Sequence, residues 1–85
     1  MEDKELVGVV THFFPQIMVA VVRLEKDLRI GDTVQIEGHG QNFEQVVESI
    51  QIDKKPIHSA KRGQEIAIKV ANPVKEKDQV FRAED

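Results

Sequence analysis

The sequence contains no cysteine, no tryptophan and no tyrosine among its 85 residues. The lack of cysteine excludes disulfides and thiolate metal sites. The longest uninterrupted apolar run, from Ile17 to Val22, is far shorter than a membrane span. The first residues are charged and lack the apolar stretch of a secretory signal. We therefore expect a cytoplasmic protein that does not enter a membrane.

Catalytic and cofactor motifs are also missing from the sequence. There is no glycine-rich loop followed by lysine and serine or threonine, so nucleotide binding is not expected. The three histidines, His12, His39 and His58, are widely separated, and no carboxylates accompany them at metal-ligand spacing. No serine lies in a Gly-x-Ser-x-Gly elbow. These absences predict a protein that is not an enzyme and that holds no metal or cofactor.

The pattern of apolar residues is typical of short strands. The chain has the length of a single domain, residues 1–85. Alternating or β-branched runs, bounded by glycine and proline, indicate strands over 6–13, 16–23, 33–37, 42–52, 64–70 and 79–83. No segment shows a sustained helical period. We therefore predict an all-β fold, a small closed six-stranded β-barrel, because closure removes exposed sheet edges.

The long run 42–52 contains one irregularity. Counting back by twos from Ile52 places Ile50, Glu48 and Val46 on the same face. Strict alternation would bury the Glu48 carboxylate, which is costly without a partner. We therefore expect a β-bulge between Val46 and Ser49 that turns Glu48 outward.

Charge is distributed unevenly along the chain. From Met1 to Asp53 there are four basic and ten acidic residues, whereas Lys54 to Arg82 contains eight basic and three acidic residues. This asymmetry indicates either ordinary solvated surface charge or a basic face for a polyanion such as RNA. Because the sequence has no tyrosine or tryptophan to stack on bases, such a face would contact the RNA backbone and recognise its shape rather than its bases. The candidate residues for this face are Lys54, Lys55, Lys61, Arg62 and Lys69.

Two adjacent phenylalanines precede the proline that ends the first predicted strand. On a strand, Phe13 and Phe14 point to opposite faces, so we expect Phe13 in the core and Phe14 near the surface. The next predicted strand is apolar on both faces and brings Met18 and Val22 close to this pair. Either both aromatics pack in the core, or Phe14, Met18 and Val22 form a docking patch for a protein partner.

Four segments, in the same order along the chain, resemble the second-domain β-barrel of elongation factor Tu and its relatives among the translation GTPases. They are Gly-Val-Val at 8–10, Leu-Arg-Ile-Gly-Asp-Thr-Val-Gln-Ile at 28–36, Val-Glu-Ser-Ile-Gln at 47–51 and Ala-Lys-Arg-Gly-Gln-Glu-Ile-Ala-Ile at 60–68. The resemblance implies a translation-protein barrel that contacts ribosomal RNA or the acceptor end of tRNA. It also implies that Glu48 takes the position of a glutamate that helps form the acceptor-end pocket.

A second resemblance concerns the segment 68–78. The run Ile-Lys-Val-Ala-Asn-Pro-Val-Lys and the residues after it are similar to the small C-terminal barrel of collagenase-like bacterial peptidases. This resemblance implies the same architecture in a different context. Our first hypothesis is a non-catalytic module that contacts RNA or a ribonucleoprotein in translation or RNA processing. The alternative is a protein–protein docking domain, as in those peptidases.

Overall fold

The computed structural model describes residues 4–38 and 40–83, and these residues form strands and no helix. Within the same ranges, no helix is long and apolar enough to cross a membrane. The radius of gyration is 11.5 Å, close to the roughly 12 Å of a folded domain of this length. The strands are β1 (Glu5–Phe14), β2 (Val19–Leu24), β3 (Leu28–Arg29), β4 (Thr33–Gly38), β5 (Gln41–Val46), β6 (Ile50–Ile52), β7 (Lys55–Ile57), β8 (Ser59–Ala60), β9 (Glu65–Lys69) and β10 (Gln79–Arg82). The all-β prediction is confirmed.

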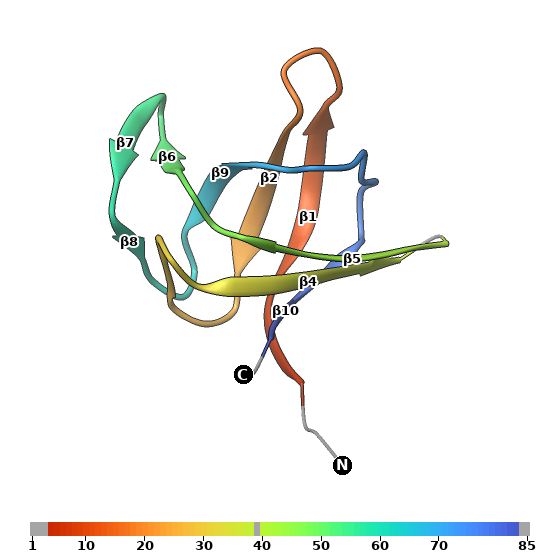
Figure 1. Ribbon diagram of the computed structural model, residues 1–85. Coiled ribbons are helices and arrows are strands. Elements are labelled where there is room, and N and C mark those ends of the chain that lie inside the picture. The colour runs from red at the N-terminus through yellow and green to blue at the C-terminus, as the bar shows by residue number, and fades with distance from the viewer. Residues whose placement is uncertain (1–3, 39, 84–85) are drawn as a thin grey trace.

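Eight of these strands form one curled antiparallel sheet (Figure 1). Their order is β5-β4-β10-β1-β2-β9-β6-β7, while β3 and β8 pair separately. No ladder joins β5 to β7 in the described part of the chain, so backbone pairing does not close the sheet. The closed, six-stranded form of the predicted barrel is therefore not confirmed. The sequence pattern missed three short strands, β3, β7 and β8, because two or three residues carry no recognisable period.

The predicted strand over 42–52 is interrupted between β5 and β6. The amide of Val47 donates to the carbonyl oxygen of Asp32 at 2.8 Å, and the carbonyl oxygen of Val47 accepts from Gly31 at 2.8 Å. Val47 is buried and Glu48 is exposed. The expected irregularity is thus confirmed, including the outward position of Glu48. Its form differs from a bulge, because the chain leaves the ladder for three residues and begins a separate strand at Ile50.

A side chain spans the gap between β5 and the chain that leaves β9. The Gln45 amide donates through Nε2 to the carbonyl oxygen of Lys69 at 2.7 Å. Its Oε1 accepts from the backbone amide of Ala71 at 2.8 Å. One glutamine therefore links two segments that no backbone ladder joins. We call this pair of hydrogen bonds the Gln45 bridge.

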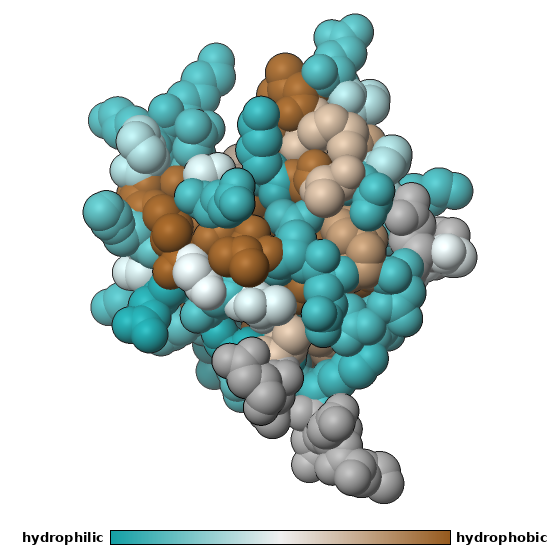
Figure 2. Space-filling model, in the orientation of Figure 1, coloured by the Kyte–Doolittle hydropathy of each residue, from teal (hydrophilic) through white to brown (hydrophobic). Residues whose placement is uncertain are grey.

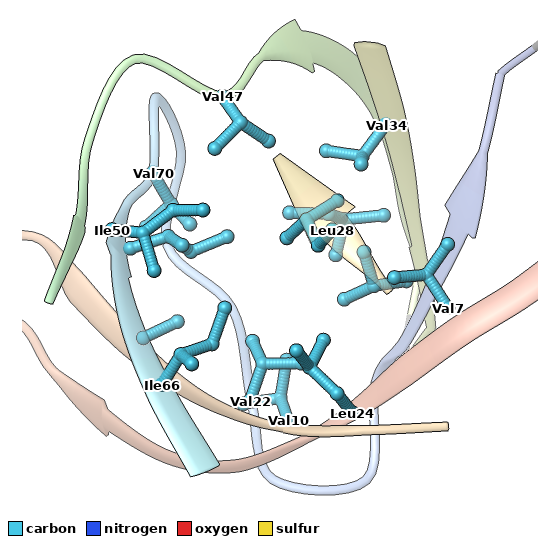
Figure 3. Close-up of a cluster of buried hydrophobic side chains, with 14 of the residues drawn as sticks. Val7, Val10, Val22, Leu24, Leu28, Val34, Val47, Ile50, Ile66 and Val70 are labelled. Carbon is cyan, nitrogen blue, oxygen red and sulfur yellow. The ribbon is translucent and has the colours of Figure 1, made fainter. Parts of the chain in front are cut away.

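Aliphatic side chains from most of the strands meet in a single core (Figure 3). On β9, Ile66 and Ile68 are buried, as their alternation predicts. A register shift between Leu6 and Gly8, where β1 pairs with β10, accompanies the burial of both Val7 and Val10, which are three residues apart. The core members labelled in Figure 3 are Val7, Val10, Val22, Leu24, Leu28, Val34, Val47, Ile50, Ile66 and Val70.

Arg82 connects three segments at the end of the domain where β1 begins. Its Nε donates to Glu5 Oε1 at 2.8 Å, and its Nη1 donates to Asp32 Oδ2 at 2.9 Å. Its Nη2 donates to the carbonyl oxygen of Asp27 at 2.6 Å. These contacts fix the last strand against the first strand and against two loops that follow β2 and β3.

The same contacts change the pKa values of Glu5 and Arg82. The hydrogen bond from Arg82 is the largest cause that lowers the pKa of Glu5 below its ordinary value. Burial alone would lower the pKa of Arg82, but its bonds to Glu5 and Asp32 outweigh burial and raise that pKa. The charged forms of Glu5 and Arg82 are therefore the stable ones across the physiological pH range.

Gly8 is the position in β1 where a side chain would be most disruptive. A methyl group there would lie 2.6 Å from the carbonyl oxygen of Arg23 and 2.6 Å from Val22 Cγ1. We expect Gly8→Ala to reduce the free energy of unfolding by about 2–3 kcal/mol, measured by urea denaturation, because the core cannot absorb the added atoms. As a control, Gly63→Ala meets open space at φ +90° and should cost about 1 kcal/mol. Equal losses in both variants would contradict the close approach of β2.

The Arg82–Glu5 contact predicts a pH-dependent stability. Because the pKa of Glu5 is lowered in the folded state, its stabilisation is complete above pH 4.5, the ordinary glutamate value, and is lost as the pH falls. Arg82→Gln should lower Tm at neutral pH, and the difference from the unchanged protein should shrink in acid. Arg23→Gln, an exposed arginine on β2, is the matched control. A Tm difference that does not vary with pH would show that Glu5 is not involved.

Candidate docking surface

The turn between β1 and β2 presents apolar side chains to solvent. The turn covers residues 15–18, and the hairpin protrudes from the rest of the domain (Figure 1). Phe14 is 43% exposed and Ile17 is 59% exposed. Apolar side chains are visible over this part of the molecule (Figure 2). We call Phe14, Ile17 and Met18 the hairpin tip. Two large exposed apolar side chains at one protruding turn are a feature of interaction sites.

The hairpin tip is held in place by contacts at its base. The rings of His12 and Phe14 lie 4.5 Å apart between centroids, tilted by 58°. His12 Nδ1 also lies 3.7 Å from Glu76 Oε2. Met18 packs against the core, and its carbonyl oxygen accepts from the amide of Val70 at 3.0 Å. The exposed side chains therefore project from a turn that is anchored on both sides.

The three docking residues predicted from the sequence have different positions. Phe14 is exposed, as expected, and Met18 is half-buried. Val22 is fully buried, so its place in a docking patch is wrong. Val22 alternates with the buried Ala20 and Leu24 along β2, and it pairs with Val10 and Ile66 on the two neighbouring strands, so it lies in the core. The docking role of Phe14 and Met18 stays a prediction.

Sequence reasoning missed Ile17. The second strand was predicted to begin at Gln16, which would place Ile17 within the sheet. The strand begins instead at Val19, and residues 15–18 form the turn. The signal was present in Pro15, since proline is common near the start of tight turns. An apolar residue two positions after that proline could have been assigned to the turn.

A second exposed apolar area lies next to the chain interruption. Ile30 is 43% exposed and Val46 is 48% exposed. The amide of Ile30 donates to the carbonyl oxygen of His58 at 3.0 Å, and Val46 pairs with Thr33 across β4 and β5. This area was not predicted, because Ile30 precedes a glycine turn and Val46 fits the alternation of a buried strand.

The predicted RNA-contacting residues are exposed but are not gathered on one surface. Lys54 and Lys55 belong to the turn and strand after β6. Lys61 and Arg62 precede β9, whereas Lys69 ends it. The sixth candidate, Glu48, lies in the connection between β5 and β6.

Acidic groups lie among the cations that precede β9. Lys61 lines a shallow hollow of about 340 Å³ together with Asp27 and Asp32. The amide of Arg62 donates to Asp27 Oδ1 at 3.4 Å. Lys69 lines a different, smaller hollow beside Val19. The continuous basic face expected from the sequence is therefore interrupted by carboxylates and divided between the two ends of β9.

The part of the chain that the structure describes contains no cluster of side chains that could hold a metal ion. Within residues 4–38 and 40–83, no three histidine, aspartate or glutamate side chains are placed to hold a metal ion. His12 contacts the Phe14 ring and the Glu76 carboxylate, and His58 lies on the loop before β8. His39, the third histidine of the sequence, lies outside the described residues.

Comparisons with known proteins find similarity to parts of peptidase proteins. No family model matches the sequence. A 76-residue segment, 88% of the chain, is 38% identical to an uncharacterized protease of Methanocaldococcus jannaschii. The matched segment spans 19% of that relative's length.

Two crystal structures of the C-terminal domain of a Geobacillus thermoleovorans U32 peptidase share the fold. Their TM-scores are 0.88 and 0.89, at 28% and 26% sequence identity. The matches cover 92% and 94% of this chain, and 99% and 93% of the two solved chains. The agreement therefore extends over the whole of a domain that has been solved by itself.

These matches correct the functional hypothesis drawn from the sequence. The first hypothesis, an RNA-contacting module like the second domain of translation GTPases, is wrong, because the relative and the solved structures are peptidase proteins. They do not show the resemblance to elongation factor Tu. They support the second resemblance, to collagenase-like peptidases. Over nearly its whole length, this chain is similar to the C-terminal domain of a U32 peptidase.

Proposed function

We propose that this chain is a non-catalytic protein-docking domain that acts together with the catalytic region of a U32-type peptidase. The observation that carries the proposal is the match to a solved C-terminal peptidase domain, which covers 99% of that domain. The segment similar to this chain makes up 19% of the Methanocaldococcus protease, so about four fifths of that protein lies outside the matched segment.

The surface of the domain supports docking rather than catalysis. Phe14, Ile17, Ile30 and Val46 are exposed, in two separate areas. Exposed apolar side chains that lie near one another favour association with another protein, because binding removes them from water. The domain therefore contributes binding, and the peptide bond is cleaved elsewhere.

Nuclear magnetic resonance can test docking directly. We expect the ¹⁵N-labelled chain to show saturable shift changes when it is titrated with the Methanocaldococcus protease from which the matching segment has been removed. Those changes should cluster on one of the two exposed apolar areas. The chain alone should not hydrolyse casein or gelatin.

The control for this titration is a ribo-oligonucleotide of mixed sequence at the same concentration, which should leave the spectrum unchanged. Docking onto the catalytic region would be refuted if the truncated protease caused no shift changes at saturating concentration. Hydrolysis by the purified chain, abolished by a single substitution in it, would refute the non-catalytic role.

A further inference from the structure

The hairpin tip is bordered by cations that the proposed docking role does not explain. Lys69 lies at the end of β9, opposite Val19, the first residue after the turn. The segment that follows β9 runs beside the outer half of β1, because the amide of Lys77 donates to the carbonyl oxygen of Val10 at 2.7 Å. Lys75 lies on the same segment. These three lysines are exposed, and the backbone contacts at Val19 and Val10 place Lys69 and Lys77 beside the two strands of the hairpin that carries Phe14.

The local charge beside the hairpin tip is positive. No ion pair engages Lys69, Lys75 or Lys77 within the described residues, whereas Lys4, Lys26 and Arg82 each have a carboxylate partner. Two carboxylates lie nearby: that of Glu76, beside His12, and that of the buried Asp78, which accepts from the backbone amide of Lys75 at 2.9 Å. Glu44 alternates with Gln45 on β5 and therefore points away from this segment. An exposed cation without a partner remains available to a ligand.

We propose that the hairpin tip and its three lysines bind an acidic polypeptide segment that carries an apolar anchor residue. The anchor would contact Phe14 and Ile17, and glutamates or aspartates on either side of it would face Lys69, Lys75 and Lys77. Opposite charge on the two partners speeds their encounter and excludes basic segments. The inference rests on the proposed docking function. It specifies the chemical character of the partner that the hairpin tip would bind.

The position of the hairpin tip favours such a partner over the peptidase region itself. Glu5 pairs with Arg82 at the first residue of β1, and Phe14 is the last residue of the same strand. Ten residues of extended chain span roughly 30 Å. In a C-terminal domain the catalytic region precedes the domain, and so it adjoins the Glu5 end. The hairpin tip would then face away from that region and remain free for a further polypeptide, such as a substrate.

A synthetic peptide with one leucine flanked on both sides by glutamates is the probe for this site. We expect it to bind the intact chain and to shift the amide resonances of the hairpin tip and of residues 69–77. The affinity should fall as salt is added, because the charges are exposed to solvent. Two comparison peptides should bind more weakly by about tenfold or more. One carries lysines in place of the glutamates, and the other carries serine in place of leucine.

Matched variants separate the hairpin tip from the rest of the surface. Ile17→Ser should weaken peptide binding about tenfold, whereas Ile30→Ser, which alters an exposed isoleucine elsewhere, should not. The double change Lys75→Glu and Lys77→Glu should abolish binding, whereas Lys54→Glu with Lys55→Glu should leave most of it. Tm is measured for each variant. Ile17 is 59% exposed, so its substitution should leave the fold intact.

The possible failures have different meanings. If the truncated protease binds but the acidic peptide does not, this inference is wrong and the proposed docking function stands. If the peptide binds through the hairpin tip but the truncated protease does not, docking onto the peptidase is wrong and the hairpin-tip site stands. Stronger binding by a ribo-oligonucleotide or by phosphatidylserine vesicles, lost in the same lysine variants, would overturn the polypeptide assignment.

Discussion

The architecture depends on a covalent constraint between β5 and β6. These strands follow one another in the chain with three residues between them, yet they lie near opposite ends of the strand order. From Val46 to Ile50 the chain can reach about 14 Å at most. The eight-stranded sheet must therefore curl until its two ends are close. The hydrogen bonds of Val47 to the turn before β4 and the Gln45 bridge hold those ends together where no ladder does.

This arrangement explains which parts of the fold could be predicted from sequence. Alternation in β4 and β9 is set by one buried face, and Ile36, Ile66 and Ile68 lie in the core as that alternation predicts. The cost of burying a carboxylate was sufficient to locate the interruption at Glu48. In each of these cases the signal is local, because it depends on the residue and its nearest neighbours.

The features that sequence could not provide are non-local. Both faces of β2 are apolar, so alternation alone could not show that Val22 lies on the core face; that depends on how β2 packs between β1 and β9. The Gln45 bridge joins residues that are 24 and 26 positions apart, and a glutamine in a polar strand carries no sign of it. Ile17 is exposed because it lies in the turn over residues 15–18, and the sequence pattern did not show where that turn ends. The barrel motifs also did not show which kind of larger protein the domain resembles, because one fold serves many functions.

The Gln45 bridge has a consequence for the motions of the domain. The amide of Ala71 belongs to an exposed residue, and it is protected through a bond to the Gln45 side chain. Rotation of that one side chain frees the amide while every backbone ladder stays intact. Its hydrogen exchange with solvent can therefore proceed through a local opening, at a lower free energy than global unfolding. Exchange at this single position reports how often the Gln45 bridge opens in the native protein.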